Sequence, residues 1–235
     1  MTTSNLAPVE QATARLERVQ ARIQAACAAA GRSTDTIRLL AVSKRHPPSS
    51  IAALHRAGLR AFGENYASEA VDKMQALAQL PLEWHYIGPL QSNKTRLVAE
   101  HFHWAQSIDR LKLIQRLEQQ RPVEMPPLQV CLQLKLGDEP SKSGAPAEAL
   151  PKLAAAVLGC RRLQLRGLMC IPPPETEPAR QRAWFARARE VRDDLRQQGF
   201  PLDTLSMGMS ADLEAAIAEG STMVRIGTAL FGPRT

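Results

Sequence analysis

The chain has 235 residues, of which 44% are hydrophobic and 23% are charged, and it carries a formal net charge of +7. This composition is ordinary for a soluble globular protein, and no apolar run is long enough to cross a bilayer. Basic residues are interleaved with acids and only 4% of residues are aromatic, so the charge favours a solvated surface or a phosphorylated small ligand over nucleic acid.

The N-terminal segment has neither the basic region nor the apolar core of a signal peptide. The cysteines, which form no CxxC pair and show no metal-ligand spacing, are Cys27, Cys131, Cys160 and Cys170. We therefore expect a cytoplasmic protein with reduced thiols and no metal site.

Residues 8–30 predict an amphipathic helix that stops at Gly31. Beyond it, helical patterns alternate with short apolar runs typical of strands, at residues 37–42, 59–64, 83–88, 103–108, 128–136, 165–171, 202–208 and 222–227. Strict alternation indicates a parallel sheet covered by helices, and eight units in about 200 residues favour a (β/α)8 TIM barrel of the α/β class. An open doubly wound sheet is the alternative.

We expect a single domain over residues 1–235, with the barrel at 37–228. No Pro/Gly/Ser-rich linker divides the chain, and the sequence ends just after the eighth predicted strand. In such barrels the ligand site lies at the carboxyl ends of the strands, so the residues at those ends are the candidates for chemistry.

The first predicted strand ends in Ser43-Lys44 and is followed by Arg45, His46 and two prolines. A lysine in this place either extends to water or lies in a dry barrel mouth. In the second case desolvation lowers the pKa of the amine and frees it for Schiff-base chemistry.

Two glycine-rich loops follow the seventh and eighth predicted strands, where these barrels often bind phosphate. Gly208 and Gly227 allow backbone N–H groups to approach an anion closely. The candidate hydroxyl donors are Ser206, Ser210 and Thr228. Ser210 is also placed to cap the helix that begins at ADLEAAIAEG. The alternative is that these are turn glycines and a structural cap.

Arg225 interrupts the apolar eighth strand, so it either pairs with a buried acid or faces an acceptor atom of a ligand. Asn65 either caps the second strand or binds the ligand. We expect Trp84 and His85 in the core, whereas Lys142 in the turn SKSG is a further candidate for the mouth.

A reactive lysine with a phosphate cradle leaves two ligand classes open, pyridoxal 5′-phosphate (PLP) and a sugar phosphate in an aldolase-like site.

The sequence closely resembles the pyridoxal phosphate homeostasis protein family over nearly its whole length, in the stretches LLAVSK, FGENY, EWHYIGPLQSNK, SKSG, LRGLM and LSMGMSADLEAAIAEGSTMVRIGTALFG. The resemblance implies a barrel like the N-terminal domain of alanine racemase, which is PLP fold type III. It also implies that Lys44 holds PLP as an aldimine, that Arg225 faces the pyridine nitrogen and that Asn65 lies beside the ring. The residues it places around the phosphate are Ser206, Ser210, Gly227 and Thr228.

By this resemblance we expect a PLP-binding protein without catalytic turnover, which takes part in intracellular PLP and amino-acid homeostasis and supplies PLP-dependent apoenzymes. A protonated arginine at the pyridine nitrogen makes the ring a poorer electron sink. A weak fold-type-III racemase is the alternative, but racemases usually take a second base, a tyrosine, from a second domain that we do not expect here. The tyrosines are Tyr66 and Tyr86. We expect a monomer that binds neither nucleic acid nor membrane.

The chain departs from many relatives at three positions. It has Lys135 where they carry asparagine, and Arg45 and His46 where they often carry threonine and lysine. We expect PLP binding despite these departures, and the exchange of the ligand stays an open question.

Overall fold

The computed structural model describes residues 8–137 and 143–232, in which eight parallel strands close into a barrel. The strands are β1 (Arg38–Val42), β2 (Ala61–Glu64), β3 (Glu83–Tyr86), β4 (Trp104–Ile108), β5 (Leu128–Leu134), β6 (Leu163–Cys170), β7 (Thr204–Ser206) and β8 (Met223–Ile226). Each strand pairs with the next along the chain, and β8 closes the barrel on β1 with Arg225 opposite Leu40. The predicted (β/α)8 barrel is confirmed, and the open sheet was the wrong alternative.

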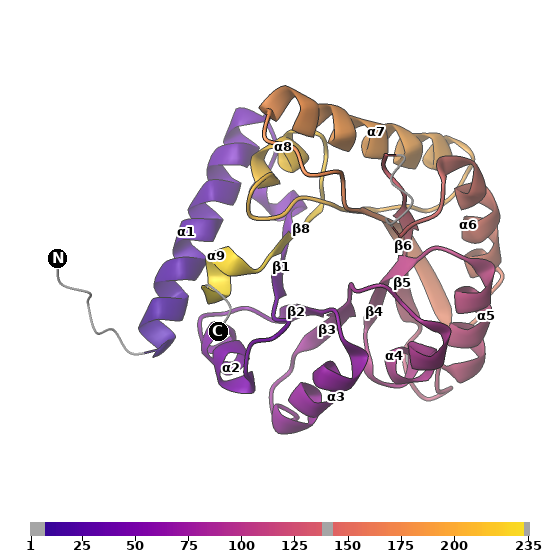
Figure 1. Ribbon diagram of the computed structural model, residues 1–235, viewed down its shortest axis with the longest axis horizontal. Helices are drawn as coiled ribbons and strands as arrows, with labels where there is room; N and C mark the ends of the chain where they lie inside the picture. Colours follow the sequence, from indigo (N-terminus) through magenta and orange to yellow (C-terminus); the bar gives the residue numbers. More distant parts are fainter. Residues whose placement is uncertain (1–7, 138–142, 233–235) are drawn as a thin grey trace.

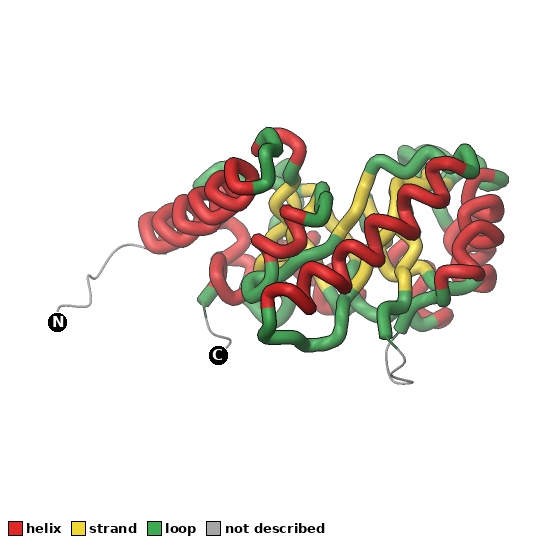
Figure 2. Tube along the Cα trace, turned by 90° about the horizontal axis from the view of Figure 1, so that it is seen from above, coloured by secondary structure: helices red, strands yellow, loops and turns green. Residues whose placement is uncertain are grey.

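Helices form a layer around the strands, seen from the barrel end in Figure 1 and from the side in Figure 2. They are α2 (Pro48–Arg56), α3 (Ala67–Ala76), α4 (Thr95–His101), α5 (Leu111–Gln120), α6 (Leu150–Leu158), α7 (Pro178–Gln197) and α8 (Leu213–Ala218). Short helical segments lie at η1 (Thr34–Thr36), η2 (Ser92–Lys94), η3 (Ala147–Ala149) and α9 (Thr228–Phe231). No helix of the described ranges is both long and apolar enough to span a bilayer.

The predicted N-terminal helix is confirmed as α1 (Pro8–Ala29), and it completes the outer layer. The helix after β8 is only the four-residue α9, which is too short to cover the junction of β8 and β1. Helix α1 packs against α2, α8 and α9 and takes that place (Figure 1). Its buried face consists of Ala12, Leu16, Val19, Ile23, Ala26 and Cys27, at the spacing of an amphipathic helix.

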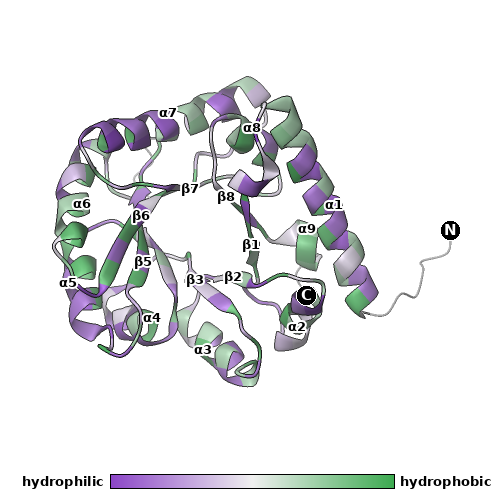
Figure 3. Ribbon diagram, turned by 180° about the vertical axis from the view of Figure 1, so that it is seen from behind, coloured by the Kyte–Doolittle hydropathy of each residue, from purple (hydrophilic) through white to green (hydrophobic). Residues whose placement is uncertain are grey.

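The strands separate two apolar clusters because successive side chains point to opposite faces. A large outer cluster lies between strands and helices, and the smaller inner cluster consists of Leu40, Ala61, Ile87, Trp104, Cys131, Met169 and Met223. Figure 3 shows the hydrophobic stretches of β5 and α6 and the many hydrophilic residues of α7. On β8, Val224 and Ile226 belong to the outer cluster and Met223 to the inner one, so the alternation places Arg225 inside the barrel.

Candidate functional site

One cavity at the mouth of the barrel brings together six of the seven predicted site residues. Its volume is about 260 Å³. The predicted residues that line it are Lys44, Asn65, Ser210, Arg225, Gly227 and Thr228. All of them come from the carboxyl ends of strands or the loops that follow, as the rule for these barrels requires.

Apolar side chains complete the cavity. Val42, Ile87 and Ile171 contribute to its wall, and Ile171 is 40% exposed at the rim. A second cavity of about 150 Å³ shares Asn65, Ile87 and Ile171 with the first and extends to Gln133 and Pro89. The mouth therefore offers an apolar slot with convergent polar groups, which is the usual form of a small-molecule site.

Lys44 lies in a tight turn directly after β1. The backbone N–H of His46 donates to the carbonyl of Ser43 at 3.0 Å, so Lys44 and Arg45 are the two central residues of the turn. Arg45 has a φ of 62°, the one left-handed value outside glycine in residues 8–137 and 143–232. Such a conformation is costly for a side-chain-bearing residue, so the surrounding structure must hold it in place.

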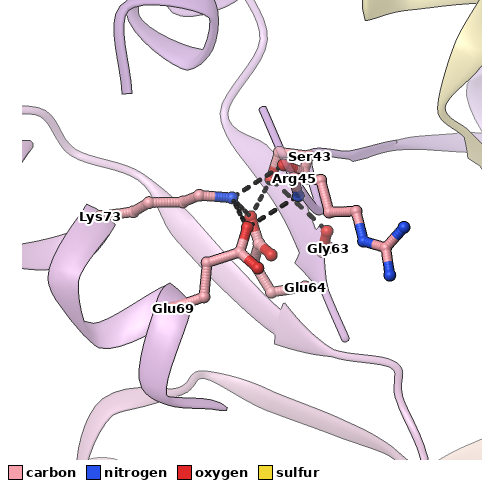
Figure 4. A network of polar contacts seen from close by, with 6 residues as sticks. All are labelled: Ser43, Arg45, Gly63, Glu64, Glu69 and Lys73. Carbon is pink, nitrogen blue, oxygen red and sulfur yellow. Dashed lines mark hydrogen bonds and ion pairs between the residues drawn. The ribbon is translucent and has the colours of Figure 1, made fainter. Parts of the chain in front are cut away.

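Three charged side chains form a clamp beneath this turn, which we define as Glu64, Glu69 and Lys73 (Figure 4). The ammonium of Lys73 donates to the Ser43 carbonyl at 2.9 Å, to Glu64 Oε1 at 2.7 Å and to Glu69 Oε1 at 2.6 Å. Glu69 Oε1 also accepts the backbone N–H of Arg45 at 2.7 Å. The clamp thus fixes the backbone on both sides of Lys44.

Burial makes the clamp a strongly coupled group of charges. Glu64 is fully buried, and this burial raises the pKa of its carboxyl, although Lys73 and the Ser43 hydroxyl oppose the shift. Glu69 is more exposed; although burial acts the other way, Lys73 and the Arg45 N–H hold the pKa of Glu69 below its ordinary value. Lys73 is the cation that both carboxyl groups share.

Arg225 enters the cavity from inside the barrel. Its Nη1 donates to the Ser206 carbonyl at 2.6 Å and to Ser206 Oγ at 2.9 Å, and Nη2 donates to the Cys170 carbonyl at 2.8 Å. It forms no salt bridge with any residue of the described ranges. A guanidinium has five N–H donors, so these three bonds leave two donors that described residues do not occupy. Of the two roles considered for Arg225, this arrangement favours the one toward a ligand.

Ser206 is the predicted site residue that does not line the cavity. It ends β7 with its side chain fully buried, and its Oγ accepts from Arg225 and donates to Gln106 Oε1 at 2.7 Å. Its one hydroxyl hydrogen is therefore donated to Gln106, and Ser206 binds the guanidinium of Arg225 without lining the cavity.

Ser210 lines the cavity, but its predicted role as a helix cap is wrong. Helix α8 begins at Leu213, and Asp212 occupies the cap position. The Asp212 carboxylate instead accepts the backbone N–H of Met209 at 2.5 Å, which closes a turn over residues 209–212. Ser210 lies inside this turn, two residues before the cap position, so its hydroxyl does not cap α8.

Asn65 follows β2 at the boundary of both cavities. Its Oδ1 is buried and has no hydrogen-bond partner among the described residues. A buried amide oxygen without a partner is costly, and a ligand in the cavity would relieve this cost. Gly88, which follows β3, allows its backbone to lie close to that of Asn65, because a Cβ at this position would collide with the backbone carbonyl of Asn65.

The departures noted in the sequence lie outside the cavity. Lys135 borders a separate cavity of about 400 Å³ beside α7, together with Trp184 and Arg187. The His46 ring stacks on Phe231 at 4.7 Å. Lys142 lies outside the described residues.

Sequence reasoning missed the clamp and a chain of polar contacts inside the barrel. Trp84 and His85 are buried as predicted, but the Nδ1 of His85 lies 2.8 Å from Gln106 Nε2, and Gln106 in turn contacts Ser206. The spacing of Glu69 and Lys73, one helical turn apart, was the one local signal for the clamp. The described ranges contain no group of three His, Cys, Asp or Glu that would hold a metal ion.

Comparison with known proteins matches nearly the whole of this chain. The family model for the alanine racemase N-terminal domain matches residues 14–235. The pyridoxal phosphate homeostasis protein of Pseudomonas aeruginosa is 59% identical over 219 residues, which cover 93% of this chain and 94% of that protein. The protein of the same name from Escherichia coli K12 is 55% identical over 225 residues, covering 93% of this chain and 95% of that one.

A solved structure gives the same result for the fold. PipY from Synechococcus elongatus, with PLP bound, superposes with a TM-score of 0.81 and 38% sequence identity. The match covers 94% of this chain and 100% of that chain. The similarity is therefore not confined to a part of the barrel.

Proposed function

The chain belongs to the pyridoxal phosphate homeostasis protein family, and we propose that it binds PLP in the cavity at the barrel mouth. The observation that carries this proposal is the convergence of a lysine, an arginine with two donors that described residues do not occupy, and two hydroxyl side chains on one cavity of about 260 Å³. The buried Asn65 oxygen without a partner fits the same ligand.

Each polar residue of the cavity has a role toward PLP. PLP supplies an aldehyde, which condenses with primary amines, and a pyridine ring, which accepts electrons. We infer that Lys44 provides the amine for a Schiff base, with loss of water, and that Arg225 donates to the ring nitrogen. The hydroxyls of Ser210 and Thr228, with backbone groups at Gly227, face the phosphate.

We propose that the protein holds PLP without efficient turnover. A guanidinium is always protonated, so Arg225 keeps the ring nitrogen as an unprotonated acceptor, which weakens the ring as an electron sink. Neither tyrosine lines the cavity: Tyr86 is buried and donates to the Pro89 carbonyl, and Tyr66 is 47% exposed beside Arg45. The positioned second base of a racemase is therefore not supplied by these residues.

The cellular part of the proposal concerns PLP and amino-acid homeostasis, with transfer of PLP to apoenzymes by a cytoplasmic monomer. Burial raises the pKa of the Cys131 and Cys170 thiols to about 12, which suits reduced, unreactive cysteines of a reducing compartment. Light scattering on the purified protein tests the monomer. Recovery of activity by a PLP-dependent apoenzyme after mixing tests the transfer.

The experiment that tests the site is reduction of the PLP-loaded protein with borohydride, followed by mass spectrometry of its peptides. We expect a visible absorption band that reduction removes and a pyridoxyl-phosphate adduct on Lys44. Lys44→Ala should lose this adduct, whereas Lys112→Ala, which removes an exposed lysine of α5, should keep it. A wild-type protein that stays colourless with added PLP would overturn the proposal and return the sugar-phosphate alternative.

A further inference from the structure

A chain of side-chain contacts crosses the interior of the barrel below the cavity. We define the interior chain as Arg225, Ser206, Gln106, His85 and Glu83, from β8, β7, β4 and β3. From Ser206 Oγ it runs 2.7 Å to Gln106 Oε1, then 2.8 Å from Gln106 Nε2 to His85 Nδ1. The His85 Nε2 then lies 2.5 Å from Glu83 Oε1. The interior chain thus joins the arginine at the mouth to a carboxylate at the opposite end of the barrel.

The hydrogen-bond directions in the interior chain follow from the donors of Arg225 and the orientation of the Gln106 amide. Arg225 has only donors, so Ser206 Oγ accepts from it, and the Ser206 hydroxyl donates its single hydrogen to Gln106 Oε1. The Gln106 amide then presents its NH2 group to His85, whose Nδ1 must accept. His85 therefore carries its hydrogen on Nε2 and donates it to Glu83.

The surroundings hold the imidazole in this neutral form. His85 is fully buried and stacks on the Trp104 ring at 5.1 Å. Burial lowers the pKa of His85 to about 4, although Glu83 opposes the shift. An imidazolium would have no lone pair for Gln106, so neutral His85 is the form that keeps the interior chain intact.

The far end of the interior chain carries a stable negative charge. Glu83 also pairs with Arg38 at 2.7 Å. Burial alone would raise the pKa of Glu83, but the hydrogen bond from His85 and the neighbouring Arg38 lower this pKa to about 2. The carboxylate is therefore a permanent acceptor at the end of a row of dipoles that begins at Arg225.

We propose that Gln106 and His85 are positioning residues for Arg225, which hold its guanidinium toward the cavity by fixing Ser206 Oγ as an acceptor. This inference rests on the proposed PLP site, in which Arg225 donates to the ring nitrogen. Neither Gln106 nor His85 lines the cavity, so neither touches the ligand. Both act through Ser206.

Gln106→Met tests this role, because methionine keeps an unbranched side chain of similar length but removes both ends of the amide. Without Gln106 the Ser206 hydroxyl no longer has a fixed direction, and loss of its one hydrogen bond with Arg225 corresponds to PLP retention about 2- to 12-fold weaker. The absorption band of bound PLP should also become pH-dependent, because a ring nitrogen no longer held against the guanidinium takes up a proton. The matched control is Cys131→Ala, which opens space in the inner cluster outside the interior chain.

A merely structural role predicts a different pattern. In that case Gln106→Met and Cys131→Ala both lose stability, while PLP affinity and the pH response of the band stay at their wild-type values. That result would overturn the proposal.

The ligand-free protein gives an independent readout by nitrogen-15 NMR of the imidazole. Wild-type His85 should be the Nε2–H tautomer, and an Nδ1–H tautomer would overturn the inference. Gln106→Glu, a second variant if Gln106→Met does not fold, replaces the amide donor by an acceptor. His85 must then carry a hydrogen on both nitrogens, so the pKa of His85 should rise by about 1–3 units.

The two proposals fail differently. A wild-type protein that shows the Nε2–H tautomer but takes up no PLP removes the proposed function, and with it the role of the interior chain toward the ring. A protein that takes up PLP on Lys44 but shows no effect of Gln106→Met on affinity or spectrum keeps the proposed function and removes only this inference.

Discussion

Glu69 on α3 accepts the backbone N–H of Arg45, the residue that follows Lys44, at 2.7 Å. Arg45 is held in a left-handed conformation at a φ of 62°. The carboxylate also takes the Lys73 ammonium, whose other bonds reach Glu64 and the Ser43 carbonyl. The direction in which the lysine leaves β1 is therefore set by a helix that follows the next strand.

The left-handed turn predicts that two substitutions at Arg45 differ in stability. Arg45→Ala removes the side chain and its contact with the Tyr66 ring, but it keeps the conformational cost. Arg45→Gly also removes that cost, about 1–2 kcal/mol for a side-chain-bearing residue, less the entropy that glycine loses on folding. Urea unfolding should thus place the glycine variant about 0.5–1 kcal/mol above the alanine variant. Equal stabilities would show that the turn is not strained.

The clamp predicts strong coupling between Lys73 and Glu64. Lys73→Met leaves the fully buried Glu64 without its cation, which should cost about 3–5 kcal/mol in the free energy of unfolding. Glu64→Gln keeps an acceptor for Ser43 and removes the charge, so the double variant should recover part of the loss. A double-mutant cycle from denaturant unfolding measures the interaction. Additive effects of the two substitutions would contradict the shared-charge account.

Sequence patterns predicted the barrel because short apolar runs alternate with helical patterns along the whole chain. They also predicted the cavity residues, since the carboxyl ends of parallel strands meet at one end of a barrel. The clamp was not predictable in this way, because Lys73 reaches Ser43 across 30 positions of the chain. Likewise, Gln106 contacts Ser206 across 100 positions. Such contacts depend on register and side-chain reach, which local patterns do not contain.

The error at Ser210 has a local physical cause. A serine ahead of Ala-Asp-Leu-Glu fits a helix cap, but the helix begins later, with Asp212 in the cap position and its carboxylate bonded to the Met209 N–H. The start of the helix depends on the turn over residues 209–212, which directly follows Gly208 with its positive φ of 93°.

Ser210→Ala should therefore separate ligand binding from stability. Its hydroxyl lines the cavity and does not cap α8, so unfolding stability should stay within about 0.5 kcal/mol of wild type. Loss of a hydrogen bond to the phosphate should weaken PLP retention about tenfold or more. Asp212→Ala, measured beside it, should lose about 1 kcal/mol of stability with the Met209 contact. Retention of PLP by Ser210→Ala at wild-type affinity would remove Ser210 from the phosphate site.

The interior chain predicts an acid-dependent loss of stability that belongs to His85. Its pKa of about 4 in the folded protein lies below the ordinary value of about 6.5. The unfolded chain therefore binds this proton first as the pH falls. The contribution of His85 to stability is complete above about pH 6.5 and is lost progressively toward pH 4, by roughly 3 kcal/mol.

His85→Gln isolates this contribution, because an amide can accept from Gln106 and donate to Glu83 but does not titrate between pH 4 and 6.5. Glu83, with its pKa of about 2, stays ionised over the same interval in the folded protein. Its own contribution to stability is lost only as the pH falls below the ordinary pKa of a glutamate, where the unfolded chain takes up that proton. Denaturant unfolding at half-unit pH steps should show the wild type losing stability faster than the variant on acidification. Parallel curves for the two proteins would mean that His85 binds its proton as readily in the folded barrel as in the unfolded chain, which a fully buried imidazole that accepts from Gln106 does not do.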